Sequence, residues 1–71
     1  MYWTVDRNIN TISKIEAYFL QGEFVSPTQV MNNIYLLQQY NPQILSQYII
    51  PIGTIIYVPV FQSTTPSVTF L

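Results

Sequence analysis

The sequence contains no cysteine and no histidine among its 71 residues. Without cysteine the chain has no disulfide framework and no thiolate ligands for a structural zinc ion. Without histidine it lacks the side chain that most often acts as a general base or binds a metal near neutral pH. We therefore expect neither a metal nor another cofactor.

Charged side chains are also scarce. One lysine, one arginine, one aspartate and two glutamates make up 7% of the chain, against about 25% in an ordinary soluble domain. Two cations form no basic patch, so we expect neither nucleic acid nor a membrane as a partner. The chain is 49% hydrophobic and 15% aromatic, and aromatic enrichment with charge depletion is typical of the core of a protein interface. This composition predicts burial in a multi-subunit assembly.

The few acidic residues offer little to catalysis. Glu16 and Glu23 are a possible carboxylate pair for glycoside hydrolysis, but their spacing is better explained by two solvated charges. Asp6 and Arg7 are more often a loop pair than a site, and the two isolated glycines form no phosphate-binding loop. We therefore expect no enzymatic activity.

The length of the chain accommodates one domain. The first residues lack the basic and apolar segments of a signal peptide, and no apolar run approaches the ~20 residues of a transmembrane helix. We expect a protein made in the cytoplasm.

Two segments have the β-branched and aromatic content of strands, residues 2–5 and 55–58. The second is expected to be buried on both faces, because four apolar residues follow one another before Pro59 ends the run. The turn before it is expected to place Pro51 at its second position and Gly53 at positive φ.

Two helices are predicted between the strands. The first covers residues 11–21 after a cap at Asn10, or starts one turn later at Ser13, and the second runs from Ser26-Pro27 to Asn41-Pro42. Their expected buried stripes are Ile12, Ile15, Tyr18 and Phe19 in the first, and Val30, Ile34 and Leu37 in the second, widened by Met31, Tyr35 and Leu36.

The remaining segments complete the predicted architecture. Residues 43–50 are expected to form a packed loop or one helical turn around Ile44-Leu45. The sequence thus predicts an α+β fold in the order β-α-α-β, with a two-stranded antiparallel sheet packed against two helices. Residues 1–61 form the predicted domain, and residues 62–71 form an extended C-terminal tail.

Short motifs in this arrangement resemble a lysin-motif (LysM) domain over roughly residues 2–59. They are an Asn-Pro pair ending the second helix, a Pro-x-Gly-Thr turn and a proline after the last strand, which correspond to Asn41, Pro42, Pro51, Gly53, Thr54 and Pro59. Since the chain is a single short unit, it is most similar to tail protein X of contractile-tailed phages, tailocins and related injection systems.

That resemblance implies a structural, LysM-like adaptor that joins tube or hub proteins to baseplate or sheath proteins of the same particle. It implies a location in the virion tail or injection particle, assembled in the bacterial cytoplasm. The candidate partner-binding residues are Trp3, Tyr57, Phe61, Val68 and Phe70. Phe61 and Phe70 are included because they lie near or beyond the end of the domain and are expected to have little core of their own to enter.

Two other functions remain open. The chain is alternatively a peptidoglycan- or chitin-binding LysM module, with a groove between residues 6–11 and 41–50. The groove residues singled out are Asp6, Asn8, Thr11, Asn41 and Ile44. The composition is also compatible with a small regulatory subunit, such as a toxin–antitoxin component.

Overall fold

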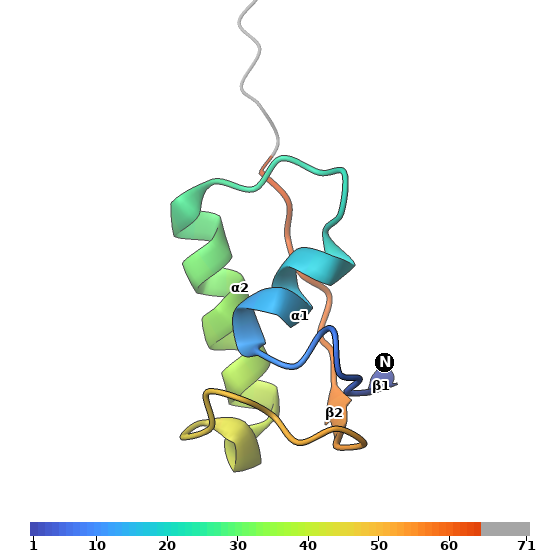
Figure 1. Cartoon of the computed structure of the whole chain (residues 1–71). Coiled ribbons are helices and arrows are strands. Elements are labelled where there is room, and N and C mark those ends of the chain that lie inside the picture. The colour runs from blue at the N-terminus through green and yellow to red at the C-terminus, as the bar shows by residue number, and fades with distance from the viewer. Residues whose placement is uncertain (65–71) are drawn as a thin grey trace, which may run out of the picture.

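The computed structural model of the protein describes residues 1–64, and Figure 1 shows their path. The elements in chain order are strand β1 (Tyr2–Thr4), helix α1 (Ile12–Phe19), helix α2 (Pro27–Tyr40), a 3-10 helix (Pro42–Ile44) and strand β2 (Ile55–Tyr57). The predicted α+β class and β-α-α-β order are confirmed. The candidate residues Val68 and Phe70 lie outside the described residues.

The two strands pair in antiparallel fashion, with Trp3 opposite Ile56 at the centre of the register. Ile56 is 1% exposed and belongs to the core, whereas its neighbour Ile55 is 63% exposed on the opposite face. The prediction that this strand is buried on both faces is therefore wrong. Both helices pack against the same face of the sheet, so alternate residues of β2 remain at the surface.

The turn before β2 is fixed by two hydrogen bonds to one carbonyl oxygen. The N–H of Thr54 donates to the carbonyl of Pro51 at 3.1 Å, and the Thr54 hydroxyl donates to the same oxygen at 2.7 Å. Pro51 is therefore the first residue of the turn, and the prediction that it occupies the second position is wrong. The predicted positive φ of Gly53 is confirmed, at +89°, and its N–H donates to the carbonyl of Val5 at 2.8 Å.

Helix α1 begins and ends close to its predicted limits. Thr11 caps it, and its Oγ1 accepts a hydrogen bond from the N–H of Lys14 at 3.2 Å, so the cap lies one residue after the predicted Asn10. Ile15 is fully buried in the core. Tyr18, predicted in the buried stripe, is instead exposed on the side of the helix nearest Trp3.

Helix α2 has the predicted signals at both ends. The Oγ of Ser26 accepts from the N–H of Gln29 at 3.2 Å, Pro27 occupies the first turn, and the helix ends before Asn41-Pro42. Its buried stripe differs from the prediction: the buried residues are Asn33 and Leu37, whereas Met31 and Tyr35 are exposed.

Two asparagines hold the C-terminal segment against α2, in an arrangement that we call the asparagine clamp. Asn41 donates from Nδ2 to the carbonyl of Tyr57 at 2.7 Å and accepts from the N–H of Tyr57 at 2.8 Å. Asn33 makes the same pair of bonds with Gln62, at 2.9 and 3.0 Å. Both amides lie on the face of α2 that carries Leu37, since the three positions are four residues apart.

The clamp guides residues 57–62 along the helix in the direction opposite to α2. Figure 1 shows this segment, in orange and red, rising from β2 toward the connection between α1 and α2. Further bonds extend the attachment: Thr64 donates its N–H to the carbonyl of Phe24 at 2.8 Å, and its Oγ1 accepts from the N–H of Ser26 at 2.9 Å. The predicted tail therefore includes three residues, 62–64, that the structure places against the domain.

Phe61 is only 9% exposed and lies in the core cluster, with its ring 6.5 Å from that of Phe19. The expectation that Phe61 has little core of its own to enter is wrong. The clamp explains the difference, because Asn33 holds the backbone of Gln62 close to α2 and so directs the preceding phenylalanine inward.

Replacing Gly53 tests the turn. Gly53→Val should lower the free energy of unfolding by more than ~1 kcal/mol, because a β-branched residue is strained at positive φ. The space around a Cβ at this position is open, so the loss reports backbone strain and not a clash. Gly53→Asn, which tolerates positive φ better, should lose less in urea denaturation. A Gly53→Val protein as stable as the original would refute the assignment.

Replacing Asn33 tests the clamp. Asn33→Leu should lower the free energy of unfolding by about 2–3 kcal/mol, because the Glu16 carboxylate and both peptide groups of Gln62 lose a hydrogen-bond partner. Asn32→Leu, at the exposed neighbouring position, should change stability by no more than ~0.5 kcal/mol. Chemical denaturation of both variants decides the matter, and similar losses would mean that the clamp contributes nothing specific.

Candidate functional site

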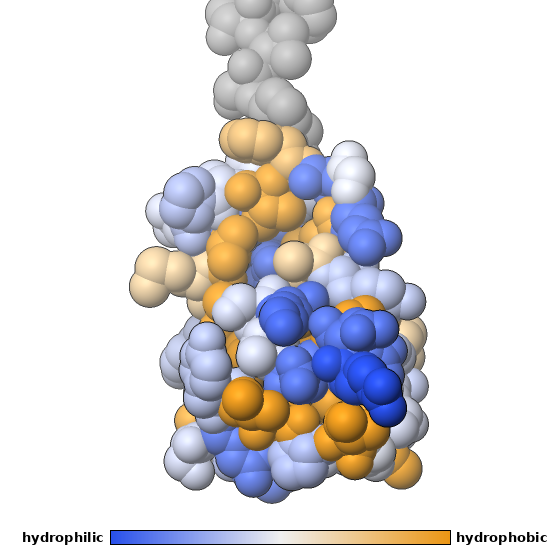
Figure 2. Space-filling model, in the orientation of Figure 1, coloured by the Kyte–Doolittle hydropathy of each residue, from blue (hydrophilic) through white to orange (hydrophobic). Residues whose placement is uncertain are grey.

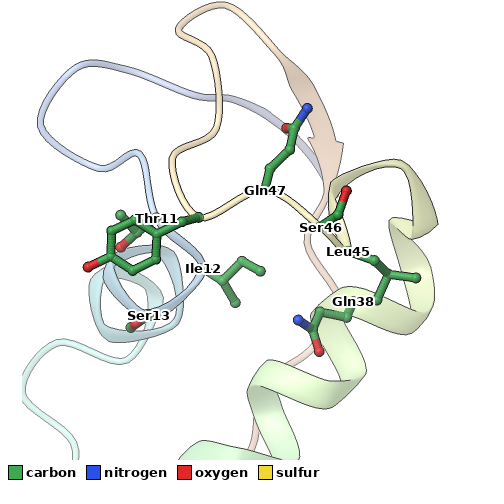
Figure 3. Close-up of a pocket in the computed structure, with 8 residues that line it drawn as sticks. Thr11, Ile12, Ser13, Gln38, Leu45, Ser46 and Gln47 are labelled. Carbon is green, nitrogen blue, oxygen red and sulfur yellow. The ribbon is translucent and has the colours of Figure 1, made fainter.

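A pocket of about 270 Å³ lies where the start of α1, the end of α2 and the loop after the 3-10 helix meet (Figure 3). Its lining residues are Thr11, Ile12, Ser13, Gln38, Leu45, Ser46, Gln47 and Tyr48. The loop is held near α1 by a hydrogen bond of 2.8 Å from the N–H of Ile50 to the carbonyl of Asn10. The pocket is thus formed by three segments, of which the first lies far in sequence from the other two.

The lining side chains are hydroxyls, amides and apolar groups. Ser13 and Ser46 supply hydroxyls, and Gln38 and Gln47 supply amides, which can donate or accept hydrogen bonds. Ile12 and Leu45 supply apolar contact. No carboxylate, lysine or arginine contributes to the lining. The pocket is therefore chemically suited to a neutral polar ligand, and it offers no acid–base pair of the kind that hydrolysis needs.

Only one of the five predicted groove residues lines this pocket, namely Thr11. Asn41 and Ile44 are each 1% exposed, so they are part of the fold and cannot contact a ligand. Asp6 and Asn8 are exposed, and Asp6 Oδ1 accepts hydrogen bonds from the N–H groups of Asn8 and Ile9 at 2.8 and 3.0 Å. That carboxylate stabilises its own loop and lies outside the pocket lining.

The pocket residues that sequence reasoning missed lie mainly in residues 45–48 and at Gln38. The range 41–50 was predicted to border a groove, but its apolar composition did not indicate which side chains face inward. The 3-10 helix buries Ile44, and the next four residues are exposed and follow the pocket edge. The short helical turn itself is as expected.

The uncovered face of the sheet carries a second candidate surface, the tyrosine row, formed by Tyr2, Tyr57 and Tyr40. The ring of Tyr57 lies 5.4 Å from that of Tyr2 and 5.2 Å from that of Tyr40. Tyr2 and Tyr40 are well exposed, and Ile55 continues the row along β2. The row presents aromatic and aliphatic surface whose only polar groups are hydroxyls.

The predicted partner-binding residues Trp3 and Tyr57 therefore lie on opposite faces of the sheet. Trp3 is half-buried, with its ring 5.6 Å from that of Phe19 and 6.0 Å from that of Tyr18. It packs against α1. Tyr57 lies in the uncovered face, as strand parity requires once Trp3 is placed on the helix side.

Glu16 is not the solvated charge that its spacing predicted. It is 4% exposed, and its Oε2 accepts a hydrogen bond of 3.0 Å from Nδ2 of Asn33. It therefore supports the clamp, while Glu23 is exposed.

Within residues 1–64, no cluster of three or more histidine, cysteine, aspartate or glutamate side chains could hold a metal ion. No helix in the described part of the chain has the length and apolarity needed to cross a membrane.

Burial of Glu16 leaves four charged side chains exposed, those of Asp6, Arg7, Lys14 and Glu23. Among residues 1–64, large apolar or aromatic side chains are exposed at thirteen positions: Met1, Tyr2, Tyr18, Phe24, Met31, Tyr35, Tyr40, Leu45, Tyr48, Ile49, Ile52, Ile55 and Val60. Figure 2 shows apolar patches on one face, separated by hydrophilic and weakly polar residues. Such clustering is typical of a surface that contacts another macromolecule.

Comparison of the chain with protein-family models, with curated proteins and with solved structures finds no match.

Proposed function

We propose that this protein is a structural subunit of a contractile phage tail or a related injection particle. In this role it acts as a LysM-like adaptor between tube or hub proteins and baseplate or sheath proteins. The observation that carries the proposal is the surface of the described part of the chain, where thirteen exposed large apolar or aromatic side chains accompany four exposed charged ones. A subunit enclosed by neighbours needs little charge for solubility, whereas a free small domain normally carries more.

The tyrosine row is the contact surface that best fits this role. Tyrosine combines a large apolar area with a hydroxyl and is over-represented among the residues that dominate binding energy at interfaces. Tyr57 is held on its backbone by Asn41 and on its ring by two neighbouring tyrosines, so the row is rigid before a partner arrives. A rigid surface loses less conformational entropy on binding.

The motifs described above add the kind of assembly. The Asn-Pro pair and the Pro-x-Gly-Thr turn resemble those of tail protein X, and the β-α-α-β order agrees with a LysM-like unit. In the structure these motifs have structural duties: Asn41 binds the backbone of β2, and Thr54 closes the turn on Pro51. They support the proposed fold relationship and leave the tyrosine row as the contact surface.

Particle incorporation tests the proposal. Ile55→Lys places a charge beside the tyrosine row and should reduce the amount of tagged protein found in particles purified from its own source by about tenfold, since burying an unpaired charge at an interface is costly. Gln39→Lys adds the same charge at an exposed position of α2, one residue before Tyr40, and should incorporate normally if the contact is confined to the sheet face.

The decisive readout is co-purification with tube, sheath or baseplate proteins, identified by mass spectrometry, together with immunogold labelling of particles. Both variants should unfold at nearly the original denaturant concentration, because their side chains are exposed. Absence of the original protein from purified particles would exclude the adaptor function. Full incorporation of Ile55→Lys would exclude the tyrosine row as the contact.

The pocket favours a second candidate function, binding of peptidoglycan or chitin. Its hydroxyls and amides, with Tyr48 at the edge, are groups that bind neutral sugars and N-acetyl substituents. If this function is correct, the protein should be retained on insoluble peptidoglycan, and Tyr48→Ala should weaken retention severalfold. Tyr35→Ala, which removes another exposed tyrosine that does not line the pocket, is the matched control. No retention of the original protein would exclude the glycan-binding function.

A further inference from the structure

Strand β1 has an open hydrogen-bonding edge. Met1 and Val58 exchange both backbone bonds, at 3.0 and 2.7 Å, which fixes the alternation of the antiparallel ladder. Trp3 then directs its peptide groups toward β2, while Tyr2 and Thr4 direct theirs away from it. Both outward residues are exposed.

The other edge of the sheet is partly covered by a side chain. The outward peptide groups of Tyr57 on β2 bind the amide of Asn41, at 2.7 and 2.8 Å. No described residue provides an equivalent cover for Tyr2 and Thr4. Within residues 1–64, the sheet can therefore accept another strand beside β1, whereas beside β2 Asn41 already occupies the outward peptide groups of Tyr57 and competes with an added strand.

The C-terminal residues have the sequence of a strand that could be added. Residues 67–71 are Ser-Val-Thr-Phe-Leu, in which polar and apolar residues alternate from Ser67 to Phe70 and β-branched and aromatic residues are frequent. Neither this segment nor β1 carries a charged side chain. Val68 and Phe70 would share one face of an added strand and could extend the aromatic surface at Tyr2.

The geometry excludes addition of this segment to the sheet of its own copy. Thr64 is bound beside Ser26 at the start of α2, whereas the sheet lies near the end of α2, where Asn41 binds Tyr57 (Figure 1). A 14-residue helix is about 21 Å long. Ser67 and Leu71, three and seven residues beyond Thr64, can lie at most about 10 and 25 Å from it. Only the last residue of the segment can reach the level of Tyr57 in the same chain, so the five residues cannot all pair along β1 of their own copy.

We propose that residues 67–71 of one copy add as a third strand to the β1 edge of a second copy of this chain. The contact goes beyond the adaptor function, because it joins identical chains. It is a head-to-tail contact, since the surface offered by one copy differs from the surface that receives it. Repetition of such a contact produces a ring where the rotation closes and a filament where it does not.

Two full-length variants separate the halves of this contact. Thr4→Pro removes an outward N–H from the receiving edge and leaves the bonds between β1 and β2, because that N–H points away from β2. The second variant combines Val68→Pro with Thr69→Pro. Because neighbouring residues direct their N–H groups to opposite edges of a strand, neither edge of the donated strand then retains a complete set of donors. Each variant retains the half that the other lacks.

Sedimentation of the purified proteins provides the test. The original chain should associate increasingly with concentration, and each variant alone should associate at least about tenfold more weakly. An equimolar mixture of the two variants should form a complex of one copy of each and grow no further, because only one donor and one receiving edge remain. In that complex, amide hydrogen exchange at Tyr2 of the tail variant should slow by about tenfold.

Three outcomes would overturn the proposal. The original chain could remain monomeric at the highest soluble concentration. This outcome would overturn the proposal even if residues 67–71 proved necessary for binding a different protein. Both variants, correctly folded by circular dichroism, could self-associate as strongly as the original chain, which would indicate another surface such as the tyrosine row. The mixture could also fail to form the one-to-one complex.

Discussion

The fold depends on side-chain amides that pair with peptide groups. An asparagine amide has the same donor and acceptor as a peptide bond, so Asn33 and Asn41 each bind one residue of the C-terminal segment as a neighbouring strand would. This solves a problem of size. Three-residue strands form few ladder bonds, and a two-stranded sheet alone is only marginally stable. The clamp satisfies peptide groups beyond the ladder and fixes the sheet to α2.

The clamp also explains why Glu16 is buried in a protein with so little charge. Asn33 uses all four of its hydrogen-bonding positions, to Gln29, Gln62 and Glu16, and the carboxylate is one of these partners. A fully satisfied polar network of this kind specifies one arrangement, because each alternative leaves a buried group unpaired. Within the described residues, no buried side-chain nitrogen or oxygen lacks a hydrogen-bond partner.

Local signals in the sequence were sufficient for the order of elements and for most of their limits. Ser26-Pro27 and Asn41-Pro42 mark the ends of α2, and Gly53 identifies the turn, because each depends only on neighbouring backbone. The burial of Asn33 could not be predicted in this way, since its partner Gln62 lies 29 residues later in the chain. Residues 62–64 were assigned to the extended tail for the same reason.

The candidate sites were less predictable than the fold. Of the predicted groove residues, Thr11 alone lines the pocket, and it does so as the cap of α1, one residue after the predicted cap. Asn41 belongs to a recognisable motif, but its amide is consumed by the backbone of β2. The tyrosine row joins β1, β2 and the last residue of α2, so only the three-dimensional arrangement brings Tyr2 and Tyr40 to Tyr57.

The same amide that stabilises β2 also makes the two edges of the sheet different. A side-chain amide ends a ladder, because it offers no further peptide groups beyond those it binds, so an added strand would have to displace Asn41 from Tyr57 beside β2 but meets no such competitor beside β1. Proteins often protect an open edge with lysine, proline or an inward charge, and residues 2–4 contain none of these. The nearest charged residues, Asp6 and Arg7, follow the strand in a separate turn. An edge that is neither closed nor charged is best explained by a strand that covers it in the assembled protein.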